Sequence, residues 1–246
     1  MAHALLSPSA AKIWMSCPGM PKLAQQVEYK VGVPAATGTL IHEMVETLLK
    51  GRLQNLTLEE YYLGSTHHVE DFDITVDQDM VDCAKVYVEY IDKRMHDLDI
   101  ARPLIEEKVR MPEIHNDLWG TADAILLSKN HLEIVDLKSG KWAVEPDNPQ
   151  LRIYALGALS RYGNEDTQVQ MTIVQPRGWH KDGHIRSYYI SAINLVEWGY
   201  ETLKPAAEAC FEEIPTYNYS EAGCRWCNAK SICNTYNLKK RENVNV

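Results

Sequence analysis

The stretch that decides the fold runs from Gly120 to Lys141 and reads "GTADAILLSKNHLEIVDLKSGK". Two apolar runs are separated by the short polar break "SKN". This pattern predicts two antiparallel strands, over residues 121–127 and 132–138, joined by a hairpin turn. Each run contains a carboxylate, and burying a charge costs free energy unless something compensates it. The compensation of Asp123 and Asp136 is therefore the first question that the sequence raises.

Strand geometry places these carboxylates relative to Lys138. Successive side chains of a strand alternate between its two faces, so Asp136 and Lys138 share one face and Leu137 points to the other. If the hairpin pairs in register, Asp123 lies beside Asp136. A different register by one residue would move Asp123 to the opposite face.

Two neighbouring carboxylates repel each other, so one of them is protonated unless a cation binds between them. A hard divalent ion such as Mg²⁺ prefers oxygen ligands, and the carbonyl of Leu137 could add one. Beside such an ion, Lys138 could stabilise the charge that grows on a phosphate during hydrolysis. The alternative interpretation is a hairpin with an ordinary cross-strand ion pair near the sheet edge.

Apolar periodicity predicts the remaining elements. Residues 55–77 are polar and are expected to be irregular, with His67 and His68 in solvent. The order helix, helix, three strands, helix, two strands, helix predicts an α/β protein with a mixed sheet flanked by helices. The expected helices cover residues 38–51, 79–98, 148–163 and 191–213, the last with a kink at Pro205, and the further strands cover residues 103–113, 167–176 and 185–191.

Composition bounds the class of protein. The 246 residues, 45% of them apolar, fit one compact domain. The chain has no apolar run long enough for a membrane span, and the start "MAHALLSPSAAK" lacks the features of a signal peptide, so we expect a soluble, cytoplasmic protein. The net charge of −9 argues against nonspecific wrapping of nucleic acid, although a local basic track could still bind phosphates.

Three further side chains are candidates for the same site. His42 borders the apolar stripe of the first predicted helix, and imidazole is a common metal ligand, but a histidine there can equally be a satisfied boundary residue. Gln150 and Tyr154 are four residues apart on the helix after the lysine strand and so share a face. Their alternative roles are a helix cap and a packing aromatic residue.

The strand before the hairpin adds one more carboxylate. Its alternation puts Ile105, Glu107, Val109 and Met111 on one face, which makes Glu107 the carboxylate on the apolar side. A slip of one residue would favour Glu106 instead. Neither residue is assigned to the site.

The six cysteines divide into two kinds. Cys83 and Cys210 lie on apolar helix faces and are expected to be core thiols. Three others form a C-x2-C-x5-C pattern in "CRWCNAKSIC", and Cys17 in "WMSCPGM" is available as a fourth ligand. Because disulfides are rare in the cytoplasm, this spacing indicates a metal centre.

These residues in combination resemble a known family. "GTLIHEMVE" with its histidine, "GTAD", "DLK" and "QLRIY" are similar to the motifs of RecB-type nucleases of the PD-(D/E)xK superfamily. One cysteine near the N-terminus and three near the C-terminus resemble its iron-sulfur subgroup, which includes the AddB nuclease domain and CRISPR-associated exonucleases. Four further segments, "LSPSAAKIWMSCPG", "NPQLRIYALGAL", "MTIVQPR" and "LKPAAEA", look like a phage and prophage family of that kind, and the likeness covers nearly the whole chain.

The resemblance implies roles for particular residues. Lys138 would be the catalytic lysine that orients or activates the attacking water, and Gln150 and Tyr154 would help to hold the DNA phosphate. The ligands of a catalytic Mg²⁺ or Mn²⁺ would be His42, Asp123, Asp136 and the carbonyl of Leu137. A 4Fe-4S cluster, or alternatively a structural Zn²⁺, would be held by Cys17, Cys224, Cys227 and Cys233. Candidates for phosphate contact are Lys12, Lys141, Arg152 and Arg177.

The same resemblance implies a fold and a function. The fold would be a restriction-endonuclease-like α/β core in a single nuclease domain, residues 1–246, with the core at about 37–210. Residues 1–36 and 211–238 would form the iron-sulfur region that joins the termini. The activity would be metal-dependent hydrolysis of DNA, as an exonuclease in phage recombination or replication. The partners would be DNA, a phage single-strand annealing or recombination protein and, as a further candidate, a second copy of the chain, in the host cytoplasm. The alternative is a noncatalytic DNA-end-binding or assembly module that retains the fold.

Overall fold

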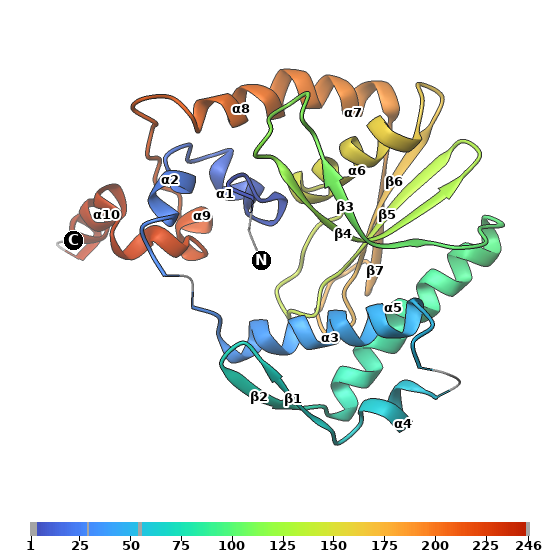
Figure 1. The fold of residues 1–246 in the computed structure, drawn as a ribbon. Helices are drawn as coiled ribbons and strands as arrows, with labels where there is room; N and C mark the ends of the chain where they lie inside the picture. Colours follow the sequence, from blue (N-terminus) through green and yellow to red (C-terminus); the bar gives the residue numbers. More distant parts are fainter. Residues whose placement is uncertain (1–3, 29, 54–55, 245–246) are drawn as a thin grey trace.

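The protein is a mixed α/β structure in which helices flank a five-stranded sheet (Figure 1). The computed structural model describes residues 4–28, 30–53 and 56–244. The strand order is β3-β4-β5-β6-β7. Their bounds are β3 Leu104–Arg110, β4 Trp119–Ser128, β5 His131–Leu137, β6 Gln168–Val174 and β7 Ile185–Ser191.

The predicted hairpin is β4 and β5. The two strands pair antiparallel, from Ser128 opposite His131 to Ala124 opposite Val135, around a turn at residues 129–130. The ladder ends there, one position before Asp123 would face Asp136. The turn at "SKN" therefore sets the pairing of β4 with β5 that the sequence predicts.

A crossover helix makes the sheet mixed. Helix α6 (Pro149–Tyr162) connects β5 to β6, and these two strands are parallel, whereas the other neighbouring pairs are antiparallel. Asn148 caps the helix, because its side chain accepts a hydrogen bond from the N–H of Leu151. Proline at the first helical position needs no N–H partner there. The capped start of α6 follows the lysine strand directly.

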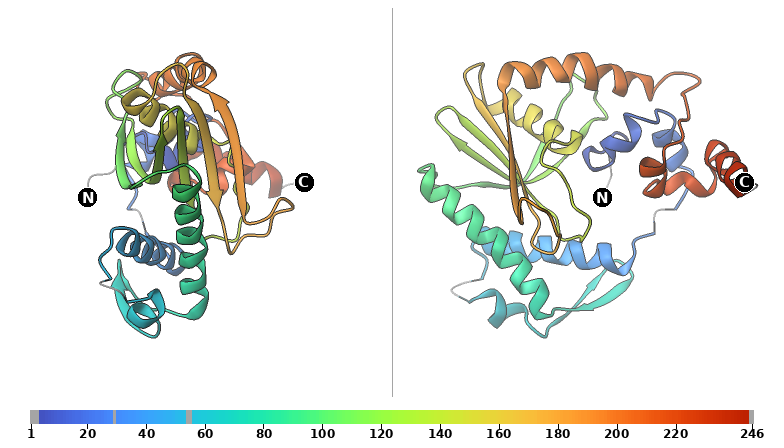
Figure 2. Two further views of the ribbon diagram at one scale, coloured as in Figure 1. Left: turned by 90° about the vertical axis from the view of Figure 1, so that its right-hand side faces the viewer. Right: turned by 180° about the vertical axis from the view of Figure 1, so that it is seen from behind.

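Two separate apolar cores hold the helices on opposite faces of the sheet. One core joins the sheet to α6 and to the helices near the termini, and the other joins it to α3 (Val33–Leu49) and α5 (Gln78–Asp97). Figures 1 and 2 show α3 crossing beside the strand ends while α5 runs along the sheet. Helix α3 thus brings its side chains to the end of the sheet where β5 finishes.

The segment expected to be irregular is folded. It forms α4 (Leu58–Tyr62) and a hairpin of β1 (Thr66–Val69) and β2 (Phe72–Thr75). Thr57 and Glu60 form a reciprocal cap that starts the helix. His68 is exposed as expected, but His67 is half-buried and its ring contacts Tyr62 at a centroid distance of 5.4 Å. The apolar residues of this segment are too few to reveal the hairpin by alternation.

The last long helix has an irregular turn just before Pro205. It continues as α7 (Ala192–Trp198), a π-helical turn η2 (Gly199–Leu203) and α8 (Lys204–Ala209). Proline cannot donate a backbone hydrogen bond within a helix. The wider turn just before it is where the hydrogen-bond pattern changes.

The two ends of the chain lie side by side (Figures 1 and 2). The N–H of Gly19 donates to the carbonyl of Thr216 at 2.9 Å, and Asn218 donates to the carbonyl of Ser16 at 2.9 Å. The short elements there are η1 Pro8–Ala10, α1 Ala11–Trp14, α2 Met20–Ala24, α9 Glu221–Arg225, η3 Asn228–Ser231 and α10 Asn234–Val244. In the described part of the chain, no helix has both the length and the apolar character that crossing a membrane needs.

Candidate metal centre

Three potential metal ligands converge from three elements. His42 of α3, Glu106 of β3 and Asp123 of β4 each offer one atom, and these atoms lie within 4.8 Å of one another. His42 Nδ1 is 3.5 Å from Asp123 Oδ1. Their side chains are 32% and 16% exposed, so solvent reaches the group. A hard cation with ligands at about 2.1 Å spans about 4 Å between opposite ligands, so this spacing suits one ion.

An unusual backbone conformation directs Glu106 toward this group. Its φ is 54°, a left-handed conformation that costs free energy for a residue with a side chain. Strand pairing continues on both sides of it, with Ile105 opposite Ala124 and Glu107 opposite Ala122. Ile105 packs against the core of α3 and α5, so it does not share a face with Val109 as the simple alternation predicts. The positive φ is the physical reason for this difference.

The neighbouring Glu107 points away from the metal group. It accepts hydrogen bonds from Arg161 at 2.6 Å and from Tyr162 at 3.0 Å, both on α6. The sequence left open which of the two carboxylates joins the metal group. In the structure it is Glu106.

Asp123 is held in place by the backbone of β5. Its Oδ2 accepts a hydrogen bond of 2.7 Å from the N–H of Leu137, just beyond the last pair of the β4–β5 ladder. The side chain therefore takes the acceptor place that a backbone carbonyl occupies elsewhere in the ladder. Its other oxygen is free to face His42.

Asp136, Lys138 and Gln150 form a closed group next to these residues. Lys138 Nζ is 2.8 Å from Asp136 Oδ2 and donates to Gln150 Oε1 at 2.9 Å. Gln150 Nε2 donates to Asp136 Oδ1 at 3.2 Å. Asp136 and Lys138 thus lie on one side of the strand, as predicted. In the described residues Asp136 Oδ2 is buried with no well-directed hydrogen bond, so the ion pair with Lys138 is its main compensation.

Protonation in this site follows from burial and neighbouring charges. Burial would lower the pKa of His42, but Asp123 outweighs it and raises the value to about 9. Burial, and secondly the charge of Asp123, raises the pKa of Glu106 to about 7. Burial also opposes the charge of Lys138, but Asp136 and Asp123 raise its pKa, so it stays an ammonium.

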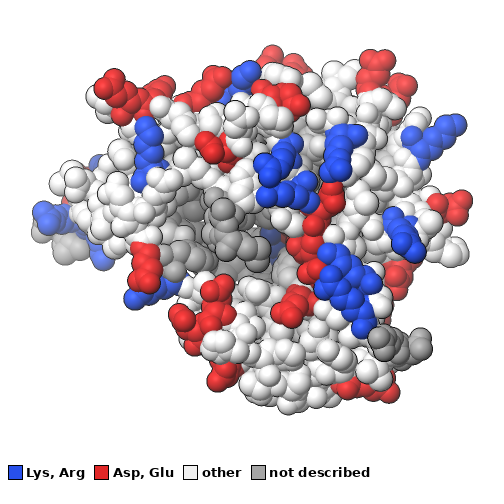
Figure 3. Space-filling model, viewed as in Figure 1, with Lys and Arg blue, Asp and Glu red and all other residues white. Residues whose placement is uncertain are grey.

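The other predicted residues differ in how close they come to this site. Tyr154 is 5% exposed, and burial followed by the charge of Asp136 raises its pKa, so the phenol stays neutral. Arg152 and Arg177 are engaged with Asp147 at 2.6 Å and Asp79 at 2.8 Å, respectively. Lys12 and Lys141 are exposed. On the face in Figure 3, basic side chains form small groups between acidic ones rather than a continuous basic surface.

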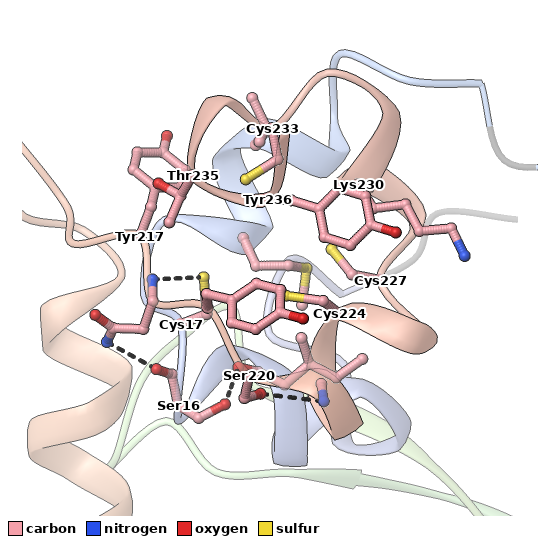
Figure 4. A pocket seen from close by; sticks show the side chains of 16 residues that line it. Ser16, Cys17, Tyr217, Ser220, Cys224, Cys227, Lys230, Cys233, Thr235 and Tyr236 are labelled. Atoms are coloured by element: carbon pink, nitrogen blue, oxygen red, sulfur yellow. Dashed lines mark hydrogen bonds between the residues drawn. The ribbon is translucent and has the colours of Figure 1, made fainter. Parts of the chain in front are cut away.

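Four cysteines line one hollow between the chain ends. The hollow has an empty volume of about 430 Å³ that includes its open mouth. Figure 4 shows the thiols of Cys17, Cys224, Cys227 and Cys233 around it. Cys83 and Cys210 are buried elsewhere, which confirms them as core thiols.

The spacing of these thiols bears on what they could hold. Four sulfur atoms at about 2.3 Å from a zinc ion lie about 3.8 Å from one another. Among the described residues, no three cysteine sulfur atoms lie within 4.8 Å of one another. The set is therefore wider than a closed zinc site. Burial raises the pKa of Cys17 and of Cys227, and the negative charge of the other thiolates adds to this.

The fold and the site define a mixed α/β protein with a solvent-reachable His-Glu-Asp group at one end of its sheet. The chain belongs to the DUF2800 family, described as a protein family of unknown function, whose model matches residues 3–245.

Two solved structures are similar to this chain over most of its length. The chain is similar to a candidate exonuclease from Eubacterium rectale, with 12% identity and a TM-score of 0.47 over 90% of this chain and 87% of that one. It is also similar to the protein SSO0001, with 12% identity and a TM-score of 0.34 over 79% of this chain and 84% of that one. Similarity at this level assigns no activity to the chain.

Proposed function

We propose that the protein is a metal-dependent nuclease that hydrolyses the phosphodiester bonds of DNA. The observation that carries this proposal is the convergence of His42, Glu106 and Asp123 directly beside the Asp136–Lys138 pair. One imidazole nitrogen and two carboxylate oxygens form a donor set that suits Mn²⁺ or Mg²⁺. Asp136 and the carbonyl of Leu137, which the sequence resemblance adds to the ligands, stay part of the proposal.

A bound divalent ion would act as a Lewis acid toward the phosphate oxygens. The chain's own groups supply the rest of the chemistry. Lys138 is held by Asp136 and Gln150, so its ammonium presents a fixed positive charge to the scissile phosphate and orients the attacking water. Tyr154 remains neutral and can donate a hydrogen bond to a phosphate oxygen without adding charge.

The choice of DNA as substrate rests on the resemblance of "GTAD", "DLK" and "QLRIY" to RecB-type nucleases. The same resemblance supports exonuclease action in phage recombination or replication, with an annealing or recombination protein as partner. The net charge of −9 limits binding to local phosphate contacts, for which Lys12 and Lys141 are exposed candidates.

We further propose that the four cysteines hold a 4Fe-4S cluster that ties the two ends of the chain together. The convergence of the four thiols on one hollow supports a shared centre, and the C-x2-C-x5-C spacing with a distant fourth cysteine favours a cluster over a single zinc ion. The segments of residues 16–19 and 216–218 already contact each other through one backbone hydrogen bond and one bond from the side chain of Asn218. The cluster's role is therefore structural.

The test of the nuclease is digestion of end-labelled linear and circular DNA, single- and double-stranded, with Mg²⁺, Mn²⁺ or EDTA. We expect cleavage with either metal, none with EDTA, and a loss of at least about a hundredfold in Asp136→Ala and Lys138→Ala. If both variants cleave like the wild type, the catalytic assignment is wrong. If the wild type binds DNA ends but cuts nothing with any divalent metal, the chain is a binding module instead.

A further inference from the structure

We propose that Trp142 and Trp226 form a stacking site for the unpaired bases of single-stranded DNA beside the metal centre. This inference rests on the nuclease function proposed above and names the form of DNA that the site takes. It is carried by four features of the two indoles: their exposure, their contact with each other, the rigid loop beneath Trp142, and their closeness in the sequence to the two clusters of potential ligands.

The two indoles are exposed and face each other. Trp142 is 69% exposed and Trp226 is 59% exposed. Their ring centroids are 6.4 Å apart and their planes meet at 72°, so one ring stands edge-on to the other. Large aromatic side chains are mostly buried, because their area dominates the energetics of cores and interfaces. Two exposed indoles from distant parts of the sequence indicate a surface that binds something.

The loop that carries Trp142 is held rigidly from below. Gln175 is 1% exposed, and its Nε2 donates to the carbonyls of Gly140 at 2.8 Å and Trp142 at 2.7 Å. Its Oε1 accepts from the N–H of Val144 at 3.1 Å and from Arg186 at 2.7 Å. Arg186 also donates to the carbonyl of Val144 at 2.8 Å. The backbone of Trp142 is therefore fixed before any ligand arrives, which lowers the entropic cost of binding.

In the sequence, Trp142 adjoins the metal-centre strand and Trp226 lies within the cysteine segment. Trp142 follows Lys138 by four residues, so their Cα atoms are at most about 14 Å apart, the length of about four stacked nucleotides. Trp226 stands between Cys224 and Cys227 in the sequence. A strand whose scissile phosphate lies at Lys138 would thus bring its next bases to these rings.

Basic side chains accompany the aromatic pair. Lys141 is exposed next to Trp142, and the guanidinium carbon of Arg225 is 5.9 Å from the centre of the Trp142 ring. Glu221 lies 3.6 Å from Arg225 and is the acidic group with which a phosphate would compete. Aromatic faces for bases with cations for phosphates are the combination that binds single strands without sequence preference.

Single-stranded DNA fits these features better than a duplex. In a duplex the faces of the bases are covered by neighbouring base pairs, so an indole reaches them only after unpairing. In a single strand every base offers a face, and stacking tolerates any sequence. A protein partner would cover the same rings without discriminating between the two forms of DNA.

The test is the equilibrium binding of fluorescein-labelled single-stranded and duplex oligonucleotides, followed by anisotropy in EDTA so that no strand is cut. We expect wild-type protein to bind the single strand more tightly than the duplex. Trp142→Ala and Trp226→Ala should each raise the Kd for the single strand about 5- to 100-fold, while Trp142→Phe stays within about threefold because it keeps a stacking face.

The matched control is Tyr61→Ala. Tyr61 is 52% exposed and forms an edge-on pair with Tyr62 on α4, and it belongs to neither cluster, so its removal should leave the Kd unchanged. Because Trp226 adjoins two cysteines, Trp142→Ala decides the outcome if Trp226→Ala does not fold. Unchanged single-strand binding in Trp142→Ala, or equal wild-type affinity for both forms of DNA, overturns the inference. Failure of the nuclease itself shows separately, as wild-type protein that cuts no DNA with Mn²⁺.

Discussion

At the scale of single residues, the most informative feature is the contrast between Glu106 and Glu107. The two carboxylates are adjacent in the sequence, yet one lies with His42 and Asp123 and the other binds Arg161 and Tyr162 of α6. The left-handed backbone at Glu106 separates them. Strain of this kind persists where the surrounding structure enforces it, often at a functional site.

This contrast gives a prediction with a built-in control. Glu106→Gln removes a charged ligand and should weaken Mn²⁺ binding at least about tenfold, with a parallel loss of DNA cleavage. Glu107→Gln removes a carboxylate of the same size one residue away and should leave the Mn²⁺ affinity unchanged. Calorimetric titration of both variants measures this. Equal Mn²⁺ affinities in the two variants would exclude Glu106 from the metal group.

Protonation of the same residues makes metal binding depend on pH. His42, with a pKa of about 9, and Glu106, with a pKa of about 7, hold protons near neutral pH that a metal must displace. The Mn²⁺ affinity should therefore rise with pH between about 6 and 9, and binding should release protons. Titration in buffers of different ionisation enthalpy measures the release; an affinity that is flat across this range would contradict the assigned ligands.

The placement of these residues could be predicted only in part. Asp136 and Lys138 share a face because strand alternation has a period of two, which the sequence shows directly. Glu106 could not be chosen over Glu107, because no residue type at that position signals a positive φ. The contact between Trp142 and Trp226 could not be predicted either, because it depends on how the C-terminal segment folds back.

At the scale of elements, helix α5 is joined to the sheet through a buried charge. Glu133 of β5 is fully buried and accepts hydrogen bonds from Tyr90 at 2.6 Å and from Arg94 Nε at 2.8 Å. It belongs to the same decisive stretch as Asp136 but points to the opposite face. The apolar periodicity located β5 and α5 closely, but it did not reveal this polar contact between them.

Removing the arginine tests that contact. Arg94→Leu leaves the carboxylate of Glu133 buried without its charged partner, which should lower the free energy of unfolding by about 3 kcal/mol. Lys93→Leu, one residue away on the exposed side of α5, should leave it nearly unchanged. Urea denaturation of both variants provides the comparison, and similar stabilities would show that the buried pair contributes little.

At the scale of the whole molecule, the two ends of the chain form one region with four cysteines at its centre. Their number and spacing predicted a shared site, because three thiols within ten residues need a fourth ligand from elsewhere. The small helices around them could not be predicted, since such short segments carry no clear periodicity.

The colour of the purified protein distinguishes an iron-sulfur cluster from zinc at the four cysteines. Anaerobically prepared wild-type protein should be brown and contain iron, and Cys224→Ser should lose both the colour and thermal stability. Cys83→Ser changes a buried thiol outside the hollow and should retain the iron. A colourless wild-type protein with one zinc ion per chain would contradict the proposed cluster.

The position of the metal is the central claim, and anomalous scattering from crystals soaked in Mn²⁺ tests it most directly. We predict an anomalous peak within bonding distance of His42, Glu106 and Asp123, adjoining Lys138. A peak held by other residues, or none at a Mn²⁺ concentration that supports DNA cleavage, would contradict the account.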